Sequence, residues 1–176
     1  MKFPHGVLVI DVESVGLHGD AFAVAYVQGD YRLNEVNSGC FHVDPGTVDG
    51  SPEGLKWVRS NVVLPADSVE CRSPRMMRDL FWAVWTLAKA KGAPLAAECL
   101  WPVEANFLTE CVGDHFIDRE WEGPYPFHDI ASIRLAAGLD PLATESRLPD
   151  ELPAHNPLAD ARQSLRLLRE ALGAIK

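Results

Sequence analysis

The spacing of apolar residues changes along the chain, and each spacing predicts a different kind of element. Residues 7–10 form an unbroken apolar run behind Gly6, which is typical of a buried strand. Two further β-like runs, 21–27 and 31–43, are separated by Gln28-Gly29-Asp30, which favours a hairpin turn. The sequence therefore predicts three consecutive strands before any helix.

Helical signals begin after residue 50. Ser51 and Ser73 each precede a proline, a pair that caps a helix and occupies its first turn, and they predict a short helix through Val58 and a long one through Lys91. Prolines and glycines further along predict a strand at 94–99, a helix after Pro102, a strand at 124–128, and helices at 130–137 and 157–171. Strands followed by alternating helices and strands predict an α/β fold, with a mixed β-sheet flanked by α-helices.

The long helix carries more large apolar residues than one narrow stripe holds. Phe81, Val84 and Leu87 share a helical face, and Trp82 and Trp85 fall beside it. One interpretation is an exposed tryptophan that marks a homodimer surface, and the alternative is a broad buried face.

Composition narrows the class of protein. The 176 residues fit a single domain, 1–176, and the share of charged residues, 23%, is ordinary for a globular chain. A net charge of −9 disfavours binding long duplexes by general electrostatics, but it leaves short or single-stranded ends open if cations lie between the carboxylates and the phosphate. The four cysteines are scattered, as in proteins whose thiols stay reduced. Residues 1–5 are too polar for a signal peptide, and no apolar run reaches membrane length. We therefore expect a cytoplasmic protein with no membrane partner.

Two acids directly follow the first apolar run. Because residues two apart on a strand point to the same side, Asp11 and Glu13 would present both carboxylates together. Two like charges held this close repel each other, and burying them is costly unless a cation neutralises them. Carboxylate oxygens suit magnesium or manganese. The sequence therefore predicts a site for hard divalent metal ions.

Three later residues could bind metal or take part in catalysis, but none of them indicates such a role by itself. Glu104 shares the inward stripe of its helix with Phe107 and would be paired or metal-bound there, unless it only complements the helix dipole or turns to solvent. Asp160 lies in the first turn of the last helix, where the dipole by itself explains an acid. His155 precedes that helix, and a loop histidine is usually just solvated, although imidazole can act as a base near neutral pH.

The order of these residues resembles the DEDDh 3′–5′ exonucleases. Asp11 and Glu13 match the Asp-x-Glu of the first strand, Glu104 the acid of a middle helix, and His155 and Asp160 the His-x-x-x-x-Asp before and in the last helix. Within that superfamily the chain is most similar to the small bacterial and phage exoribonuclease-like branch. There, a segment like residues 44–48 leads into a helix that contains a tryptophan, matched here by Trp57.

The resemblance implies a ribonuclease-H-like fold and a metal-dependent 3′–5′ exonuclease that acts on single-stranded RNA or DNA 3′ ends or short oligonucleotides. Two Mg²⁺ or Mn²⁺ ions would activate water for in-line attack and stabilise the leaving oxygen. His155 would be the general base, in a proline-rich loop that closes on the substrate. The implied metal ligands and catalytic acids are Asp11, Glu13, Glu104 and Asp160. The implied substrate-binding residues are Ser14, Val15, Gly16, Leu17 and Phe107.

Two alternatives stay open. Phe107 would stack on a base in the substrate-binding interpretation, but its helical stripe favours a place in the core. Where the family usually has Asn-x-x-Phe-Asp, this chain has Leu100 in place of the Asn and Glu104 in place of the Asp. This departure suggests a second function, a catalytically weakened relative that binds nucleotides or nucleic acid or serves as an interaction module.

Overall fold

A six-stranded mixed sheet lies at the centre of the computed structural model, which describes residues 3–175. The strand order is β4-β3-β2-β1-β5-β6. β1 runs antiparallel to β2 and parallel to β5, and β5 runs parallel to β6, so the C-terminal ends of β1, β5 and β6 meet at one edge. The strands are β1 Val7–Ser14, β2 Ala21–Gly29, β3 Glu35–His42, β4 Val69–Glu70, β5 Leu95–Ala97 and β6 Phe127–Asp129.

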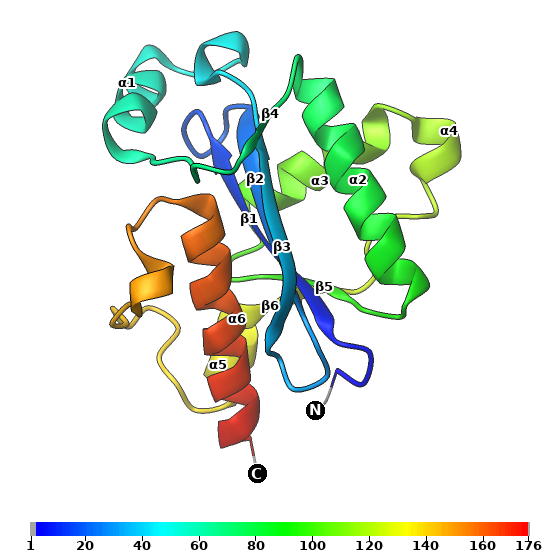
Figure 1. Ribbon diagram of the computed structural model, residues 1–176, viewed down its shortest axis with the longest axis vertical. Helices are drawn as coiled ribbons and strands as arrows, with labels where there is room; N and C mark the ends of the chain where they lie inside the picture. The colour runs from blue at the N-terminus through cyan, green and yellow to red at the C-terminus, as the bar shows by residue number, and fades with distance from the viewer. Residues whose placement is uncertain (1–2, 176) are drawn as a thin grey trace.

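Helices cover both faces of this sheet (Figure 1). α2 and α3 pack on one face with α4 beside them, whereas α5 and α6 pack on the other. The helices are α1 Pro52–Asn61, α2 Pro74–Ala90, α3 Val103–Gly113, α4 Phe116–Arg119, α5 Ile130–Ala136 and α6 Pro157–Ala174, with 3-10 turns η1 Pro45–Thr47 and η2 Pro149–Glu151. The predicted α/β fold with a flanked mixed sheet is confirmed.

The central strand divides its side chains between two cores. Leu8 and Ile10 point into the core beneath α2 and α3, whereas Val7 and Val9 point into the core beneath α5 and α6. Because side chains alternate along a strand, residues 11 and 13 continue the row of Val7 and Val9. The alternation therefore directs two acids toward the α6 side of the sheet.

The hairpin turn is longer than predicted. β2 continues through Gly29, and β3 begins only at Glu35, so the expected turn at residues 28–30 is wrong. The Asp30 carboxylate accepts hydrogen bonds from the amides of Arg32 at 2.8 Å and Asn34 at 2.9 Å. An aspartate that binds the following amides nucleates a wider loop than a two-residue turn.

Both tryptophans of α2 are buried. The Arg119 guanidinium lies over the Trp82 ring, 4.8 Å from its centre, and Trp85 Nε1 donates to the Glu122 carbonyl at 2.9 Å. The interpretation of an exposed tryptophan is therefore wrong, and the broad buried face is correct. A homodimer stays a prediction. Leu87, expected on the buried face, is instead 66% exposed, because the buried face of α2 is centred on Phe81 and Trp85 and Leu87 falls outside it.

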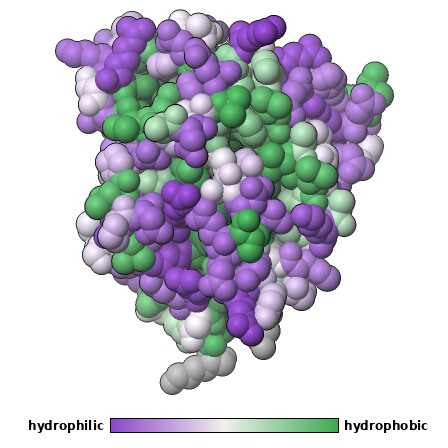
Figure 2. All heavy atoms as spheres, viewed as in Figure 1, coloured by the Kyte–Doolittle hydropathy of each residue, from purple (hydrophilic) through white to green (hydrophobic). Residues whose placement is uncertain are grey.

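The visible surface is mainly hydrophilic, and the cysteines are unpaired. Hydrophilic side chains cover most of the face in Figure 2, interrupted by groups of hydrophobic ones. All four cysteines are free, and Cys40, Cys71 and Cys111 are buried. Across residues 3–175, the structure contains no helix whose length and hydrophobicity would let it cross a bilayer.

Candidate active site

A cavity of about 420 Å³ opens at the C-terminal end of β1. Its walls come from four segments that are far apart in the sequence: β1 with the turn after it, α1, the start of α3, and the start of α6. The lining residues are Asp11, Val12, Glu13, Ser14, Gly16, Leu17, Trp57, Val103, His155 and Asp160. Most of the residues singled out by the motif therefore meet in one place.

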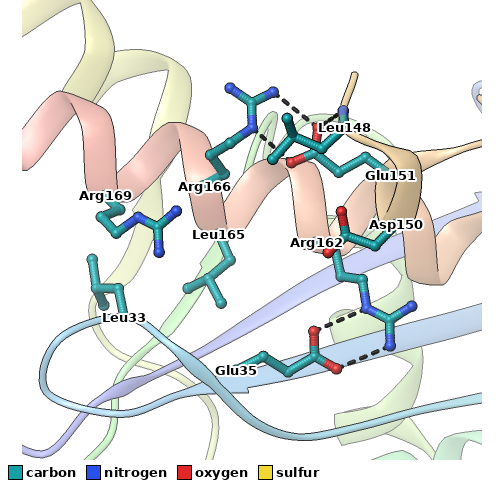
Figure 3. Close-up of a pocket in the computed structure, with 9 residues that line it drawn as sticks. All are labelled: Leu33, Glu35, Leu148, Asp150, Glu151, Arg162, Leu165, Arg166 and Arg169. Carbon is teal, nitrogen blue, oxygen red and sulfur yellow. Dashed lines mark hydrogen bonds and ion pairs between the residues drawn. The ribbon is translucent and has the colours of Figure 1, made fainter. Parts of the chain in front are cut away.

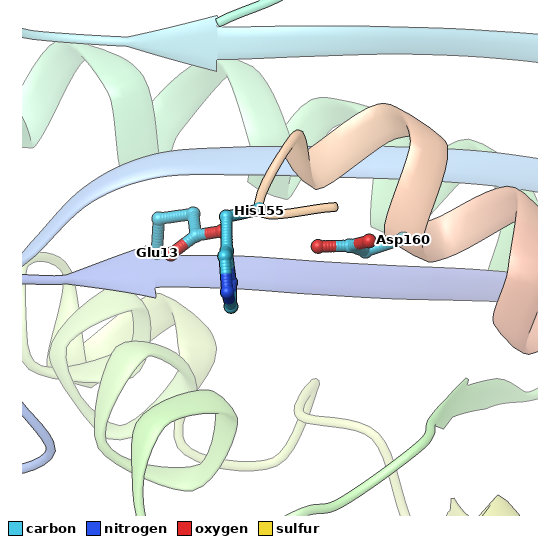
Figure 4. Close-up of side chains that lie close together, drawn as sticks. All are labelled: Glu13, His155 and Asp160. Atoms are coloured by element: carbon cyan, nitrogen blue, oxygen red, sulfur yellow. The ribbon is translucent and has the colours of Figure 1, made fainter. Parts of the chain in front are cut away.

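Three of these side chains converge closely. One ligand atom each from Glu13, His155 and Asp160 lies within 4.8 Å of the others. Figure 4 shows them side by side, Glu13 rising from β1, His155 from the loop before α6 and Asp160 from the first turn of α6. Two carboxylates and an imidazole at this spacing are able to share a single metal ion.

The start of α6 places Asp160 through its cap. The Asn156 side chain accepts hydrogen bonds from the amides of Leu158 and Ala159, at 3.2 and 3.1 Å, so the helix begins at Pro157. Ala161 is completely buried in the core between α6 and the sheet. A small side chain there lets the helix approach the sheet closely, so that Asp160 reaches the acids of β1.

His155 is held by α1 and the segment that follows it. Its carbonyl accepts a hydrogen bond from the Val63 amide at 2.9 Å. Its ring meets the Trp57 ring edge to face, with centroids 5.0 Å apart. The backbone of His155 has φ +57°, a left-handed conformation that costs a non-glycine residue about 1–3 kcal/mol. These contacts hold the strained residue in place and aim its ring at the cavity.

The acids of β1 occupy an environment that opposes their charge. Burial raises the pKa of Asp11 well above its usual range, and the neighbouring carboxylates of Asp160 and Glu13 add to the effect. Burial likewise raises the pKa of Glu13 to about 7, with Asp160 and Glu104 as further causes. Burial also raises the pKa of Asp160, although the Arg147 guanidinium acts in the opposite direction.

Glu104 joins the same group from α3. Burial raises its pKa to about 7, against a hydrogen bond from the Val12 backbone that lowers it. Because Glu104 in turn raises the pKa of Asp11 and Glu13, the acid lies toward β1 rather than toward solvent. The Glu104 carboxylate therefore interacts electrostatically with the acids of the strand, although it is not one of the three residues whose ligand atoms lie within 4.8 Å.

Two charged residues of this neighbourhood were missed in the sequence. Glu98 directly follows β5, accepts a hydrogen bond from Ser164 Oγ at 3.2 Å, and helps to raise the pKa of Asp11. Its place near Asp11 could have been predicted from the sequence, because Glu98 lies near the end of a predicted strand and parallel strands end at the same sheet edge. Arg147 forms an ion pair with Asp160. It lies in an aperiodic loop, and no pattern in the sequence marks it.

The predicted substrate-binding residues divide into two groups. Ser14, Gly16 and Leu17 line the cavity, and Leu17 is 68% exposed there. Val15, predicted to bind substrate, is instead buried, and its amide donates to the Asp20 carbonyl at 3.1 Å. The turn after β1 therefore offers the Leu17 side chain rather than the Val15 amide.

The substrate-stacking interpretation of Phe107 is wrong. Its side chain is 1% exposed, and its ring packs against Phe81 with centroids 5.1 Å apart. Stacking on a base requires an open ring face, and both faces here belong to the core beneath α2 and α3. The core alternative, which the helical stripe favoured, is correct.

The donor set fits divalent metal ions. It consists mainly of carboxylate oxygens, the ligands that magnesium and manganese accept, with one imidazole beside them. Mutual repulsion and burial raise the pKa of Asp11 and Glu13, and a bound cation would reverse both effects. Glu13, His155 and Asp160 bring their ligand atoms together for such an ion, and Asp11 and Glu104 lie near enough to interact electrostatically with this group.

No protein-family model and no curated protein sequence matches the chain. Solved structures of exonuclease I do match it. E. coli exonuclease I in complex with a dT13 oligonucleotide aligns with a TM-score of 0.64 and 12% identity, covering 94% of this chain and 40% of that one. Exonuclease I from Methylocaldum szegediense aligns with a TM-score of 0.60 and 17% identity, covering 94% and 40%. The zinc-bound E. coli complex with single-stranded DNA gives a TM-score of 0.59 and 11% identity, covering 93% and 39%.

These likenesses define the class of fold. It is ribonuclease-H-like, as the resemblance to the DEDDh exonucleases implied. The chain spans about 40% of the length of the exonuclease I chains that it matches.

Proposed function

We propose that the protein is a metal-dependent 3′–5′ exonuclease that hydrolyses phosphodiester bonds at single-stranded 3′ ends. The observation that carries the proposal is the convergence of Glu13, His155 and Asp160 at the cavity, with ligand atoms within 4.8 Å of one another. The fold supports it, because the similar exonuclease I structures hold single-stranded DNA or oligonucleotides.

The acids form the metal-binding part of the proposed site. Asp11, Glu13, Glu104 and Asp160 would hold two divalent ions, Mg²⁺ or Mn²⁺. When bound, such ions activate water as a nucleophile and stabilise the leaving oxygen of an in-line displacement. The buried position of the four acids excludes much of the solvent, which strengthens their interaction with cations.

The other residues of the cavity would position the substrate and move a proton. A ring nitrogen of His155 accepts the proton from the attacking water, and the contacts with Trp57 and Val63 orient that ring. Leu17, exposed at the mouth, packs against the terminal base or sugar. Ser14 and Gly16 form the floor beside it. An apolar side chain at the mouth favours an unpaired terminal nucleotide, because pairing would hold the base in the duplex and prevent it from turning onto that side chain.

The test is cleavage of 5′-labelled single-stranded RNA and DNA oligonucleotides with Mg²⁺ or Mn²⁺. We expect a ladder that shortens from the 3′ end, disappears in EDTA and is lost in Asp11→Asn. Asp118→Asn, the same change at an exposed position of α4, is the control and should leave the ladder intact. Folded wild-type protein that leaves both oligonucleotides uncut with either metal would refute the exonuclease and favour the binding module.

A further inference from the structure

A positive charge already lies beside the acids of the cavity. The Arg147 guanidinium is ion-paired with Oδ1 of Asp160, and its Nη1 also donates to the Glu151 carbonyl at 2.9 Å. Both side chains are largely buried, at 23% and 15% exposed. Among residues 3–175, Arg147 is the one arginine or lysine that forms an ion pair with Asp11, Glu13, Glu104 or Asp160.

The loop holds Arg147 rigidly in this position. The Glu151 side chain, 2% exposed, accepts two hydrogen bonds from Arg166, at 2.6 and 2.9 Å (Figure 3). Glu151 also accepts the Leu148 amide at 2.9 Å, and Arg166 donates to the Ser146 carbonyl at 2.9 Å. Hydrogen bonds therefore fix the backbone on each side of Arg147, at Ser146 and Leu148, so the loop itself positions Arg147 for the ion pair with Asp160.

The ion pair occupies one of the two oxygens through which Asp160 would bind a metal. Asp160 is the residue that α6 contributes to the proposed metal site, and Arg147 holds one of its two carboxylate oxygens. A guanidinium this close to a divalent cation repels it strongly, because partial burial weakens screening by solvent. Without metal, however, the same charge offsets part of the repulsion among the acids.

We propose that Arg147 is an internal counter-cation, which a divalent metal ion must displace from Asp160 before the site loads. Arg147 thereby stabilises the metal-free protein and sets the metal concentration at which the site becomes competent. This inference rests on the proposed function, because it takes Asp160 as a metal ligand. Its readout is metal binding without substrate, which does not depend on cleavage.

The test is the affinity for Mn²⁺, measured by isothermal titration calorimetry on wild type, Arg147→Gln and Arg147→Lys. We expect Arg147→Gln to bind Mn²⁺ about tenfold more tightly or better, since the competing charge is gone. Arg147→Lys, which keeps the charge without the planar fork, should fall between the two. In EDTA, Arg147→Gln should melt at a lower temperature than wild type, because the acids lose their counter-charge.

Arg162→Gln is the matched control. Arg162 lies on α6, but its guanidinium pairs with Glu35 outside the cavity (Figure 3). This variant removes the same charge and should leave the Mn²⁺ affinity within about twofold of wild type, because distant exposed charges are screened.

The possible failures are distinct. Equal or weaker Mn²⁺ binding by folded Arg147→Gln, with normal binding by wild type, would overturn the displacement and make Arg147 a positioning residue for Asp160. If neither wild type nor Arg147→Gln binds Mn²⁺, the proposed metal site itself fails, and this inference fails with it.

Discussion

The acids of the site lie in surroundings that disfavour the charged form of their carboxyl groups. Glu13 and Glu104 come from different elements, yet burial raises the pKa of each to about 7. Perturbed carboxyl groups that gather in a cavity are characteristic of functional sites, because an ordinary surface would leave them solvated. Their free energy in the folded, metal-free protein therefore depends on pH.

We expect the metal-free protein to become less stable as the pH rises. Because the folded pKa of Glu13 and Glu104 lies above that of a solvated carboxyl, the folded state binds more protons than the unfolded state between the two values. The free energy of unfolding therefore falls from about pH 5 upward and levels off above the folded pKa. Thermal unfolding in EDTA should show a Tm several degrees lower at about pH 8 than at about pH 5.

Two comparisons identify the groups responsible. Glu13→Gln removes one titrating group and should flatten the dependence of Tm on pH. Saturating Mg²⁺ should raise Tm most at high pH, where the acids are charged and the site binds cations best. A Tm of the metal-free wild type that rises over this interval would contradict the assignment of raised pKa values.

Helix starts and loop anchors bring these side chains together. Asn156, the residue after His155, caps α6. The His155 ring contacts Trp57, and its carbonyl accepts the Val63 amide, so the histidine is held in place. The proline-rich loop before α6 is held by ion pairs, among them Arg134 with Glu145. Closure of this loop on a substrate stays a prediction, and it would have to move against these anchors.

Capping variants should separate stability from geometry. Asn156→Ala removes the acceptor for the Leu158 and Ala159 amides and should cost about 1 kcal/mol of unfolding free energy. Ser73→Ala removes the corresponding bond from the Met76 amide at the start of α2 and should cost a similar amount, about 1 kcal/mol. Urea unfolding measures both changes.

The two variants should differ in activity. Asn156→Ala loosens the turn that carries His155 and Asp160, so we expect its kcat/KM on an oligonucleotide to fall about tenfold or more, since small displacements of catalytic groups are costly. Ser73→Ala lies in a helix that contributes no side chain to the cavity and should keep its activity. Equal losses in both variants would show that cap stability alone controls the rate.

The chain as a whole is acidic, so we expect substrate binding to depend on bound cations. With a net charge of −9, the protein repels phosphates unless metal ions lie between them and the carboxylates. We expect His155→Ala to bind a fluorescent single-stranded oligonucleotide at least about tenfold more tightly with Mn²⁺ than with EDTA. Fluorescence anisotropy at matched ionic strength measures this ratio, and equal affinities would argue against metal-mediated binding.

Much of the architecture is predictable from local patterns in this chain. Ser51 and Ser73 begin helices where their caps predicted, because an N-cap acts within its own turn. The period of two along β1 places Asp11 and Glu13 on one side, because strand geometry alone requires it. The hairpin turn was misplaced, because Asp30 binds the amides that follow it rather than completing a tight turn.

The sequence by itself determined most of the elements, the face of β1 that bears the acids, and the motif that resembles the DEDDh exonucleases, since all of these depend on neighbouring residues or on their order. Folding in three dimensions decided the rest. Glu98 came to lie beside Asp11, Arg147 paired with Asp160, and the Trp57 ring met the His155 ring, each through contacts between segments remote in the chain. Such contacts depend on how helices pack against the sheet, which no local spacing of residues encodes.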